Sequence, residues 1–158
     1  MPLILFSVLL AFVLNAASLP EPMRVWRPEF VLMTCLYWVI HATPRFGMGR
    51  TWIVGLLMDV LTQTPLGVHA FAYLLVAAIA WRSAVPLRMV GLVQEGLAVA
   101  GLLLLAIAVE QSLLWIVGAP GGGLLDWSTW GGLVPSLLMW PAVALLLSRL
   151  RRGVEIYP

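Results

Sequence analysis

Asp59 and His69 are the two residues whose types and spacing come closest to a chemical site in this sequence. Asp59 lies in the apolar segment GLLMDVL, residues 55–61, and His69 follows in TQTPLGVHA, residues 62–70. The chain is expected to reverse direction at TPLG, so the two side chains can meet. An Asp–His pair is not a catalytic unit by itself, because a nucleophile or a metal ion is also needed. We therefore interpret His69 as a packing or capping residue at the start of a helix.

The carboxylate of Asp59 needs a special environment if its segment lies in a membrane. A charge at bilayer depth costs at least a few kcal/mol, so such residues usually face the interior of a helix bundle, a cavity or a partner. We predict that Asp59 is a buried hydrogen-bonding or ion-pairing hub, or a contact for a partner helix. Two alternatives remain open. Asp59 faces water at the outer end of a short span, or it couples to proton or substrate movement.

Two further polar residues, Glu110 and Gln111, lie deep inside the long apolar segment 90–118. Polar side chains at such a depth can hydrogen-bond across helices and hold them together. With the Asp–His pair, they complete our candidate intramembrane polar hub. Asn15, in the first apolar segment, is interpreted in the same way.

Motifs of known catalytic chemistry are missing from the sequence. It contains no HExxH, GxSxG, P-loop or GxGxxG pattern, and two histidines with one cysteine cannot supply a typical zinc site. Cys35 stands alone, so the sequence predicts no intrachain disulfide and a buried, inert thiol. We assign no catalytic, cofactor-binding or metal-binding residue and predict that the protein is not an enzyme. The rival hypothesis of a membrane enzyme requires Asp59 and Glu110 to converge from different helices.

The composition places these residues in a membrane protein. Of 158 residues, 62% are hydrophobic and 10% are charged, and the mean hydropathy is +1.01. A soluble domain is about 25% charged, so this chain has too little polar surface to cover a core in water. Residues 1–158 are predicted to form a single polytopic membrane domain. The nine cationic residues are all Arg and are scattered between apolar segments, which argues against a nucleic-acid partner despite the net charge of +2.

The apolar segments predict an all-α bundle of about six transmembrane helices. Segments two to four are short for a full crossing. The fifth is longer than the bilayer is thick, so we place its first turns, with Gln94 and Glu95, at the membrane surface. Pro135 and Pro141 are expected to kink the sixth segment. The first segment lacks a positively charged start and is interpreted as a span rather than a cleaved signal peptide. The predicted spans cover residues 3–19, 30–43, 51–61, 66–81, 90–118 and 130–148.

The arginines predict the orientation of this bundle. With a cytoplasmic N-terminus, the inner connections and the C-terminal tail carry seven arginines, and the outer connections carry two. This imbalance satisfies the positive-inside rule, so both termini are predicted to be cytoplasmic. His41, near the inner end of the second span, is expected to extend towards water. The glycine-rich connection 119–129 is expected to be a flexible outer loop.

Five short motifs are spread along the chain: WRPE at 26–29, YW at 37–38, GLL with Asp59 at 55–59, TPLG with His69 at 64–69, and WP at 140–141 followed by RLRR at 149–152. Together they resemble the rod shape-determining protein MreD family over essentially the whole chain. The sequence departs from that pattern at Gln63, where many relatives have glycine, and at Val68, where a glutamine often precedes the histidine. The residues that carry the family motif are Gly55, Leu56, Leu57, Asp59, Gly67 and His69.

The resemblance implies a non-enzymatic, multi-pass subunit of the bacterial inner membrane. Such proteins belong to the Rod complex, or elongasome, and support cell shape and lateral peptidoglycan synthesis. The implied partners are membrane lipid, an MreC-like protein and, through it, MreB, RodA and a class B penicillin-binding transpeptidase; no cofactor is implied. The family also looks similar to the substrate-binding subunits of energy-coupling-factor transporters, which is an analogy of fold and not of function.

A scaffold that holds the single transmembrane segment of an MreC-like partner is therefore our main functional hypothesis. The alternative is a membrane transport subunit that binds a small molecule or a lipid. That alternative predicts an internal cavity lined by Asp59, His69, Glu110 or Gln111.

Overall fold

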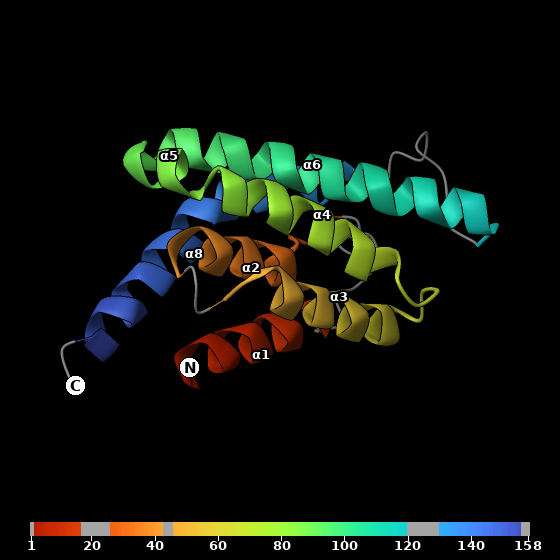
Figure 1. Ribbon diagram of the computed structural model, residues 1–158, viewed down its shortest axis with the longest axis horizontal. Coiled ribbons are helices and arrows are strands. Elements are labelled where there is room, and N and C mark those ends of the chain that lie inside the picture. The colour runs from red at the N-terminus through yellow and green to blue at the C-terminus, as the bar shows by residue number, and fades with distance from the viewer. Residues whose placement is uncertain (1, 17–25, 43–45, 120–129, 156–158) are drawn as a thin grey trace.

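The computed structural model of this protein describes residues 2–16, 26–42, 46–119 and 130–155. The regular secondary structure of these ranges is helical, which confirms the prediction of an all-α fold for the described residues; the number of membrane crossings stays a prediction. In chain order the helices of Figure 1 are α1 (Pro2–Ala16), α2 (Phe30–His41), α3 (Met48–Thr62), α4 (Val68–Arg82), α5 (Ala84–Met89), α6 (Leu92–Val117) and α8 (Leu133–Glu155).

The boundaries of the long helices lie within a few residues of the predicted spans at most ends. α3 begins at Met48, three residues earlier than predicted, and α4 begins only at Val68 because residues 64–67 form the turn. The short α5 was not predicted. It tolerates Pro86 in its first turn, where the missing N–H has no intrahelical acceptor. The predicted end of the first span and most of the glycine-rich connection lie outside the described residues.

α2 lies at the centre of the bundle, where it contacts α1, α4, α5, α6 and α8. All ten of its residues from Val31 to Ile40 are buried. A helix that is apolar all round belongs in a core, and the sequence of α2 follows this rule. Cys35 lies on this helix and is fully buried, as predicted. The indole Nε1 of Trp38 donates to Ser7 Oγ at 2.8 Å and joins α2 to α1.

The outer faces of the other helices are apolar. Every described helix except α2 carries large hydrophobic side chains that are exposed, such as Leu5 at 70%, Leu138 at 74% and Val93 at 77%. Soluble monomers rarely expose so much contiguous apolar surface, so lipid is the favoured surrounding. Two helices, 92–117 and 133–152, are long and apolar enough to cross a membrane, whereas α1, α2 and α4 are apolar but shorter.

α8 differs from the prediction at one of its two prolines. Pro135 is the third residue of the helix, where its missing N–H removes no intrahelical hydrogen bond. The expectation that Pro135 removes a backbone hydrogen bond and kinks the span is therefore wrong. Only Pro141 lies in the interior of this helix, and α8 continues through it as far as Glu155.

The two ends of the bundle are formed by different parts of the chain. Figure 1 places the start of α1, the short α5 and the end of α8 at one end, and the α3–α4 turn at the other. Two arginines at the first end act on the backbone as well as through their charge. Arg88 Nε donates to the carbonyl oxygen of Ile40, and Arg151 Nη1 donates to that of His41 at 3.0 Å. Both bonds satisfy carbonyls at the C-terminal end of α2.

Candidate functional site at the α3–α4 turn

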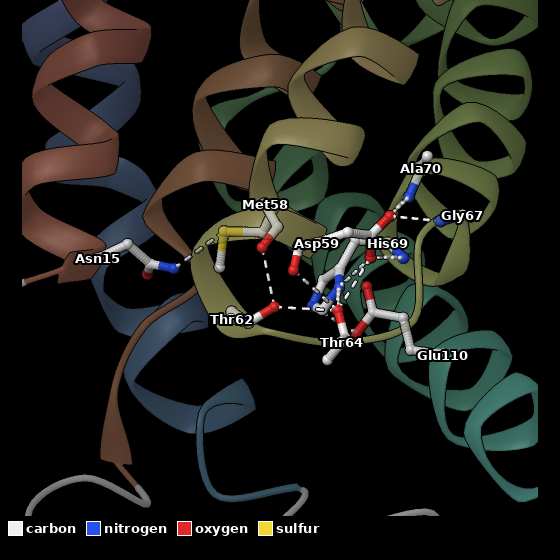
Figure 2. Close-up of polar contacts among 9 residues, drawn as sticks. All are labelled: Asn15, Met58, Asp59, Thr62, Thr64, Gly67, His69, Ala70 and Glu110. Carbon is white, nitrogen blue, oxygen red and sulfur yellow. Dashed lines mark hydrogen bonds and ion pairs between the residues drawn. The ribbon is translucent and has the colours of Figure 1, made fainter. Parts of the chain in front are cut away.

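The carboxylate of Asp59 lies at the N-terminus of α4 and is 0% exposed. Its Oδ2 accepts the backbone N–H of Gly67 at 2.8 Å and that of Ala70 at 3.4 Å, while Oδ1 accepts the N–H of His69 at 2.8 Å (Figure 2). The first N–H groups of a helix lack intrahelical partners and carry partial positive charge, so a carboxylate is stabilised there. The alternative in which Asp59 faces water is therefore wrong.

Two side chains complete the surroundings of the Asp59 carboxylate. His69 Nδ1 lies 2.8 Å from Oδ1, and Thr64 Oγ1 donates to the same oxygen at 3.1 Å. An ionised carboxylate has about four lone-pair directions, and five contacts surround this one. The structure thus brings the predicted Asp–His pair together and leaves no acceptor position on Asp59 for a substrate.

Gly55 allows α4 to come close enough for these bonds. It lies one helical turn before Asp59 on the same face of α3. A Cβ atom at this position would lie 2.5 Å from Ala70 Cα and 2.8 Å from Ala70 N. Such distances are shorter than any real contact, so a larger residue would push α4 away from α3. The glycine of the family motif is thereby explained by close packing of two backbones.

The turn between α3 and α4 is held by backbone geometry. Gln63 ends α3 in the left-handed region with φ 56°, and the Thr64 N–H donates to the carbonyl oxygen of Asp59 at 3.1 Å. This bond is the six-to-one contact of a Schellman motif. Gly67, with φ 104°, then starts α4. Asp59 therefore acts twice, through its carbonyl at the end of α3 and through its carboxylate at the start of α4.

Glu110 approaches the same histidine from α6. Its Oε2 lies 4.0 Å from His69 Nε2, the ring nitrogen opposite to the one that faces Asp59 (Figure 2). This distance is too long for a hydrogen bond and fits an ion pair when the imidazole is protonated. Gln111 follows on the same helix, half-buried and rotated by about 100°. Three of the four predicted hub residues therefore converge, and Gln111 lies on the neighbouring face.

Three residues of this region escaped the sequence reasoning: Thr64, Tyr73 and Glu29. The ring of Tyr73 meets that of His69 edge-on, with centroids 6.0 Å apart. Glu29 precedes α2; burial raises the pKa of its carboxyl group above the ordinary value, while the nearby His69 and Arg27 act to lower it. Tyr73 could have been found, because it lies four residues after His69 on one helix face. Glu29 could not, since it arrives through tertiary packing.

The remaining predicted residues lie around this cluster. Asn15 Nδ2 contacts Met58 Sδ at 3.6 Å and links α1 to α3, as expected for a polar contact between helices. Leu56 is half-buried, and Leu57 is 54% exposed on the outer face of α3. These two residues of the family motif thus contribute apolar surface and make no polar contact with the carboxylate.

The arrangement of Thr64, His69 and Asp59 differs from that of a catalytic triad. In a catalytic triad, the hydroxyl and the carboxylate lie at opposite ring nitrogens of the histidine. Here Thr64 Oγ1 and Asp59 Oδ1 both lie at His69 Nδ1, at 3.2 Å and 2.8 Å. Within the described part of the chain, no group of three or more His, Cys, Asp or Glu side chains could hold a metal ion. What the site offers is a buried network that joins α3, α4 and α6.

Comparisons with known proteins agree with the resemblance in the sequence. The family model for rod shape-determining protein MreD matches residues 1–150 of this chain. The Rod shape-determining protein MreD of Haemophilus influenzae is 28% identical over 155 residues, which cover 98% of this chain and 93% of that protein. No solved structure matches the chain, so the expected likeness to transporter subunits stays a prediction.

Proposed function

The chain belongs to the MreD family of rod shape-determining proteins, and from this membership we propose that it is a non-enzymatic inner-membrane scaffold of the Rod complex. It holds an MreC-like protein in the membrane and through it supports lateral peptidoglycan synthesis, with both of its own termini in the cytoplasm. The observation that carries this proposal is the family match over residues 1–150. The same membership indicates a role in rod cell shape.

The Asp59 cluster supports a structural role within this scaffold. Both oxygens of the carboxylate are occupied by protein donors, so the group has little capacity to bind or transfer anything else. Its bonds reach the backbone of α4, and His69 extends the network to Glu110 on α6. The hub therefore sets the relative positions of three helices.

We infer that a partner of this protein contacts its helices or its short outer connections. The turn between α3 and α4 has only residues 63–67. A standard interface buries about 800 Å² on each partner, and so few residues cannot supply that area alone. The partner that fits an apolar helix surface inside a membrane is itself an apolar helix.

We place the transmembrane helix of the MreC-like partner in an apolar groove between α1, α2 and α8. The groove has a volume of about 170 Å³ and includes residues from Phe6 to Leu14 on α1 and from Met139 to Leu150 on α8. These stretches correspond to about 12 Å and 16 Å of helix. A second apolar groove, between α6 and α8, involves only residues 100–104 and 133–137. The longer groove suits a helix lying along it.

The test is to fill each groove with a tryptophan. Ala142 lines the longer groove and Ala100 the shorter one, so Ala142→Trp and Ala100→Trp form a matched pair. We expect Ala142→Trp to reduce co-purification of the MreC-like protein at least tenfold, and Ala100→Trp to leave it near the native level. Deleting the partner's transmembrane segment should abolish co-purification in all cases.

Two results would contradict this placement. Full co-purification of an MreC-like protein without its transmembrane segment would exclude the helix-mediated mode altogether. Loss of the partner in Ala100→Trp alone would move the contact to the other groove and leave the scaffold function intact.

The transport alternative predicts a cavity lined by the hub residues, and the two apolar grooves, between α1, α2 and α8 and between α6 and α8, are lined by other side chains. The transport alternative would be favoured if native mass spectrometry found a small molecule bound to the native protein and absent from the purified His69→Ala variant.

A further inference from the structure

A second buried pair of histidine and carboxylate lies at the opposite end of the bundle, between α2, α6 and α8. His41 Nε2 lies 3.7 Å from Glu95 Oε1. Glu95 is 4% exposed and therefore lies inside the protein, and the half-buried side chain of His41 lies beside it; their depth in a membrane stays a prediction. The pair opens onto a pocket of about 260 Å³ whose other lining residues are Tyr37, Leu92, Ala144, Ser148, Arg151 and Arg152.

Three of the residues that line this pocket each carry a buried polar atom without a hydrogen-bond partner among the described residues. They are Glu95 Oε1, the hydroxyl of Tyr37 and Nε of Arg151. Buried polar atoms are nearly always paired in native proteins, with protein groups, water or a ligand. Three such atoms around one pocket therefore point to an absent polar group that carries both donors and acceptors.

The histidine shows where a donor is needed. His41 Nδ1 lies 3.2 Å from the carbonyl oxygen of Tyr37, and a carbonyl can only accept. Nδ1 therefore carries the ring proton, and in the neutral ring Nε2 is an acceptor. It faces Glu95 Oε1, which is also an acceptor, across 3.7 Å. A group with several N–H donors, such as a primary ammonium, satisfies both acceptors at once.

The other side of the pocket suits an anion. Arg151 is held in place by its bond to the carbonyl oxygen of His41, and Arg152 is exposed at the pocket edge. Guanidinium groups are preferred ligands of phosphate. The volume of about 260 Å³ lies below the range of about 300–1,000 Å³ typical of pockets for drug-sized ligands, so a compact group fits best.

We propose that this pocket binds the headgroup of an aminophospholipid, with its primary ammonium between Glu95 and His41 and its phosphate at Arg151 and Arg152. A lipid is the favoured source of this chemistry because the pocket borders exposed apolar surface. Leu92 lines the pocket and is 42% exposed, and the neighbouring Val93 is 77% exposed. Acyl chains have a surface to lie on there. The assignment goes beyond the scaffold role and does not depend on it.

The experiment uses the full chain, purified in detergent, stripped of lipid and titrated in native mass spectrometry. The probes are phosphatidylethanolamine, phosphatidylcholine and phosphatidylglycerol with identical acyl chains. Phosphatidylcholine keeps the positive charge but has no N–H donor, and phosphatidylglycerol has no ammonium. We expect phosphatidylethanolamine to bind about tenfold more tightly than either, as the loss of one charge-assisted hydrogen bond implies.

Two variants test the two halves of the pocket. Glu95→Gln removes the partner of the ammonium, so the preference for phosphatidylethanolamine should fall to less than about twofold. Arg152→Gln should weaken the binding of all three lipids. Its matched control is Arg149→Gln, the same charge change on an exposed residue of the same helix, which should have little effect.

Several outcomes would overturn the assignment. These are equal binding of phosphatidylethanolamine and phosphatidylcholine by the native protein, an unchanged preference in Glu95→Gln, or equal effects of Arg152→Gln and Arg149→Gln. Displacement of the lipid by an equal concentration of soluble phosphoethanolamine would show that the pocket binds a soluble ligand and not a lipid. If Glu95→Gln fails to fold, the relative affinities of the native protein for the three lipids still test the proposed site.

Discussion

The two ends of this bundle each bury a histidine beside a carboxylate, and the two pairs differ in what surrounds the carboxylate. At the α3–α4 turn, Asp59 lies 2.8 Å from His69 and also accepts three backbone N–H groups. At the other end, Glu95 lies 3.7 Å from His41, and its Oε1 has no hydrogen-bond donor in the described residues. The same two residue types therefore form two kinds of network. We call the first closed, because protein donors occupy both carboxylate oxygens of Asp59, and the second open, because Oε1 of Glu95 lacks a donor.

The two carboxylates differ because a helix begins beside Asp59 and none begins in the same way beside Glu95. α4 begins beside Asp59, so its free N–H groups neutralise the charge. Glu95 itself lies in the first turn of α6, His41 of α2 lies beside it, and side chains of α8 line the same pocket. A carboxylate capped by the start of another helix is committed to the fold. One that lacks such a cap keeps its capacity to bind a ligand.

The largest effect is expected from removing the closed network. Asp59→Leu leaves the N–H groups of Gly67 and His69 and the His69 ring without their acceptor, which typically costs about 3–5 kcal/mol for a broken buried pair. We expect a strongly lowered melting temperature in detergent, followed by tryptophan fluorescence, and loss of partner co-purification. Val60→Leu, on the exposed face of the same helix, is the control. A melting temperature equal to that of the control would mean that the network contributes nothing.

Gly55→Ala tests whether close packing creates the network. The new Cβ would overlap the backbone of Ala70, and overpacking of this kind costs about 1–3 kcal/mol. Gly101→Ala on α6 meets open space and should be neutral or slightly stabilising. Thermal unfolding of both variants checks the prediction. If Gly55→Ala were as stable as Gly101→Ala, the close approach of α3 and α4 would not matter.

Replacing each carboxylate by its amide should destabilise the protein at the α3–α4 turn and not at the other end. Asp59→Asn turns one acceptor oxygen into an NH₂ group that faces backbone donors, which costs about 1–3 kcal/mol. Glu95→Gln removes a buried charge and can donate to His41 Nε2, so its stability should equal or exceed the native value. Melting temperatures of the lipid-free proteins measure both. Equal destabilisation by the two variants would erase the distinction between closed and open networks.

The smallest effect is expected at the turn itself. Gln63 has a left-handed φ of 56°, which favours glycine, so Gln63→Gly relieves backbone strain but adds freedom to the unfolded chain. We expect a change within about 1 kcal/mol, on the stabilising side. Hydrogen exchange of the Thr64 amide should slow or stay the same in this variant. Faster exchange would show that the glutamine side chain supports the turn.

Much of this fold follows from the pattern of apolar residues. The continuous apolar run of α2 predicts a helix, and its complete burial follows from the same run. The meeting of Asp59 and His69 was predictable because it depends on a turn of a few residues. The left-handed φ of Gln63, a backbone conformation that favours glycine, could not be read from the sequence, which has a glutamine there.

Other features depended on contacts that periodicity does not encode. The N–H donors of α4 could not be assigned to Asp59 until the close approach at Gly55 was known. The pairing of His41 with Glu95 joins helices far apart in the chain, and the spacing of residues along one helix does not locate it. The first-turn position of Pro135 was missed for a different reason, because the start of α8 lies beside a connection with little sequence signal.

The central position of α2 has a consequence for how the protein fits its bilayer. A helix of 12 residues is about 18 Å long, well short of a hydrocarbon thickness of about 30 Å. Hydrophobic mismatch arises only where a helix touches lipid, and α2 is enclosed by its neighbours. We therefore expect the bilayer to adjust to the helices with exposed apolar faces, from α1, α3 and α4 with 15 residues each to α6 with 26. Substitutions that lengthen or shorten the apolar part of α6 should shift the preferred acyl-chain length, while changes in α2 should alter packing alone.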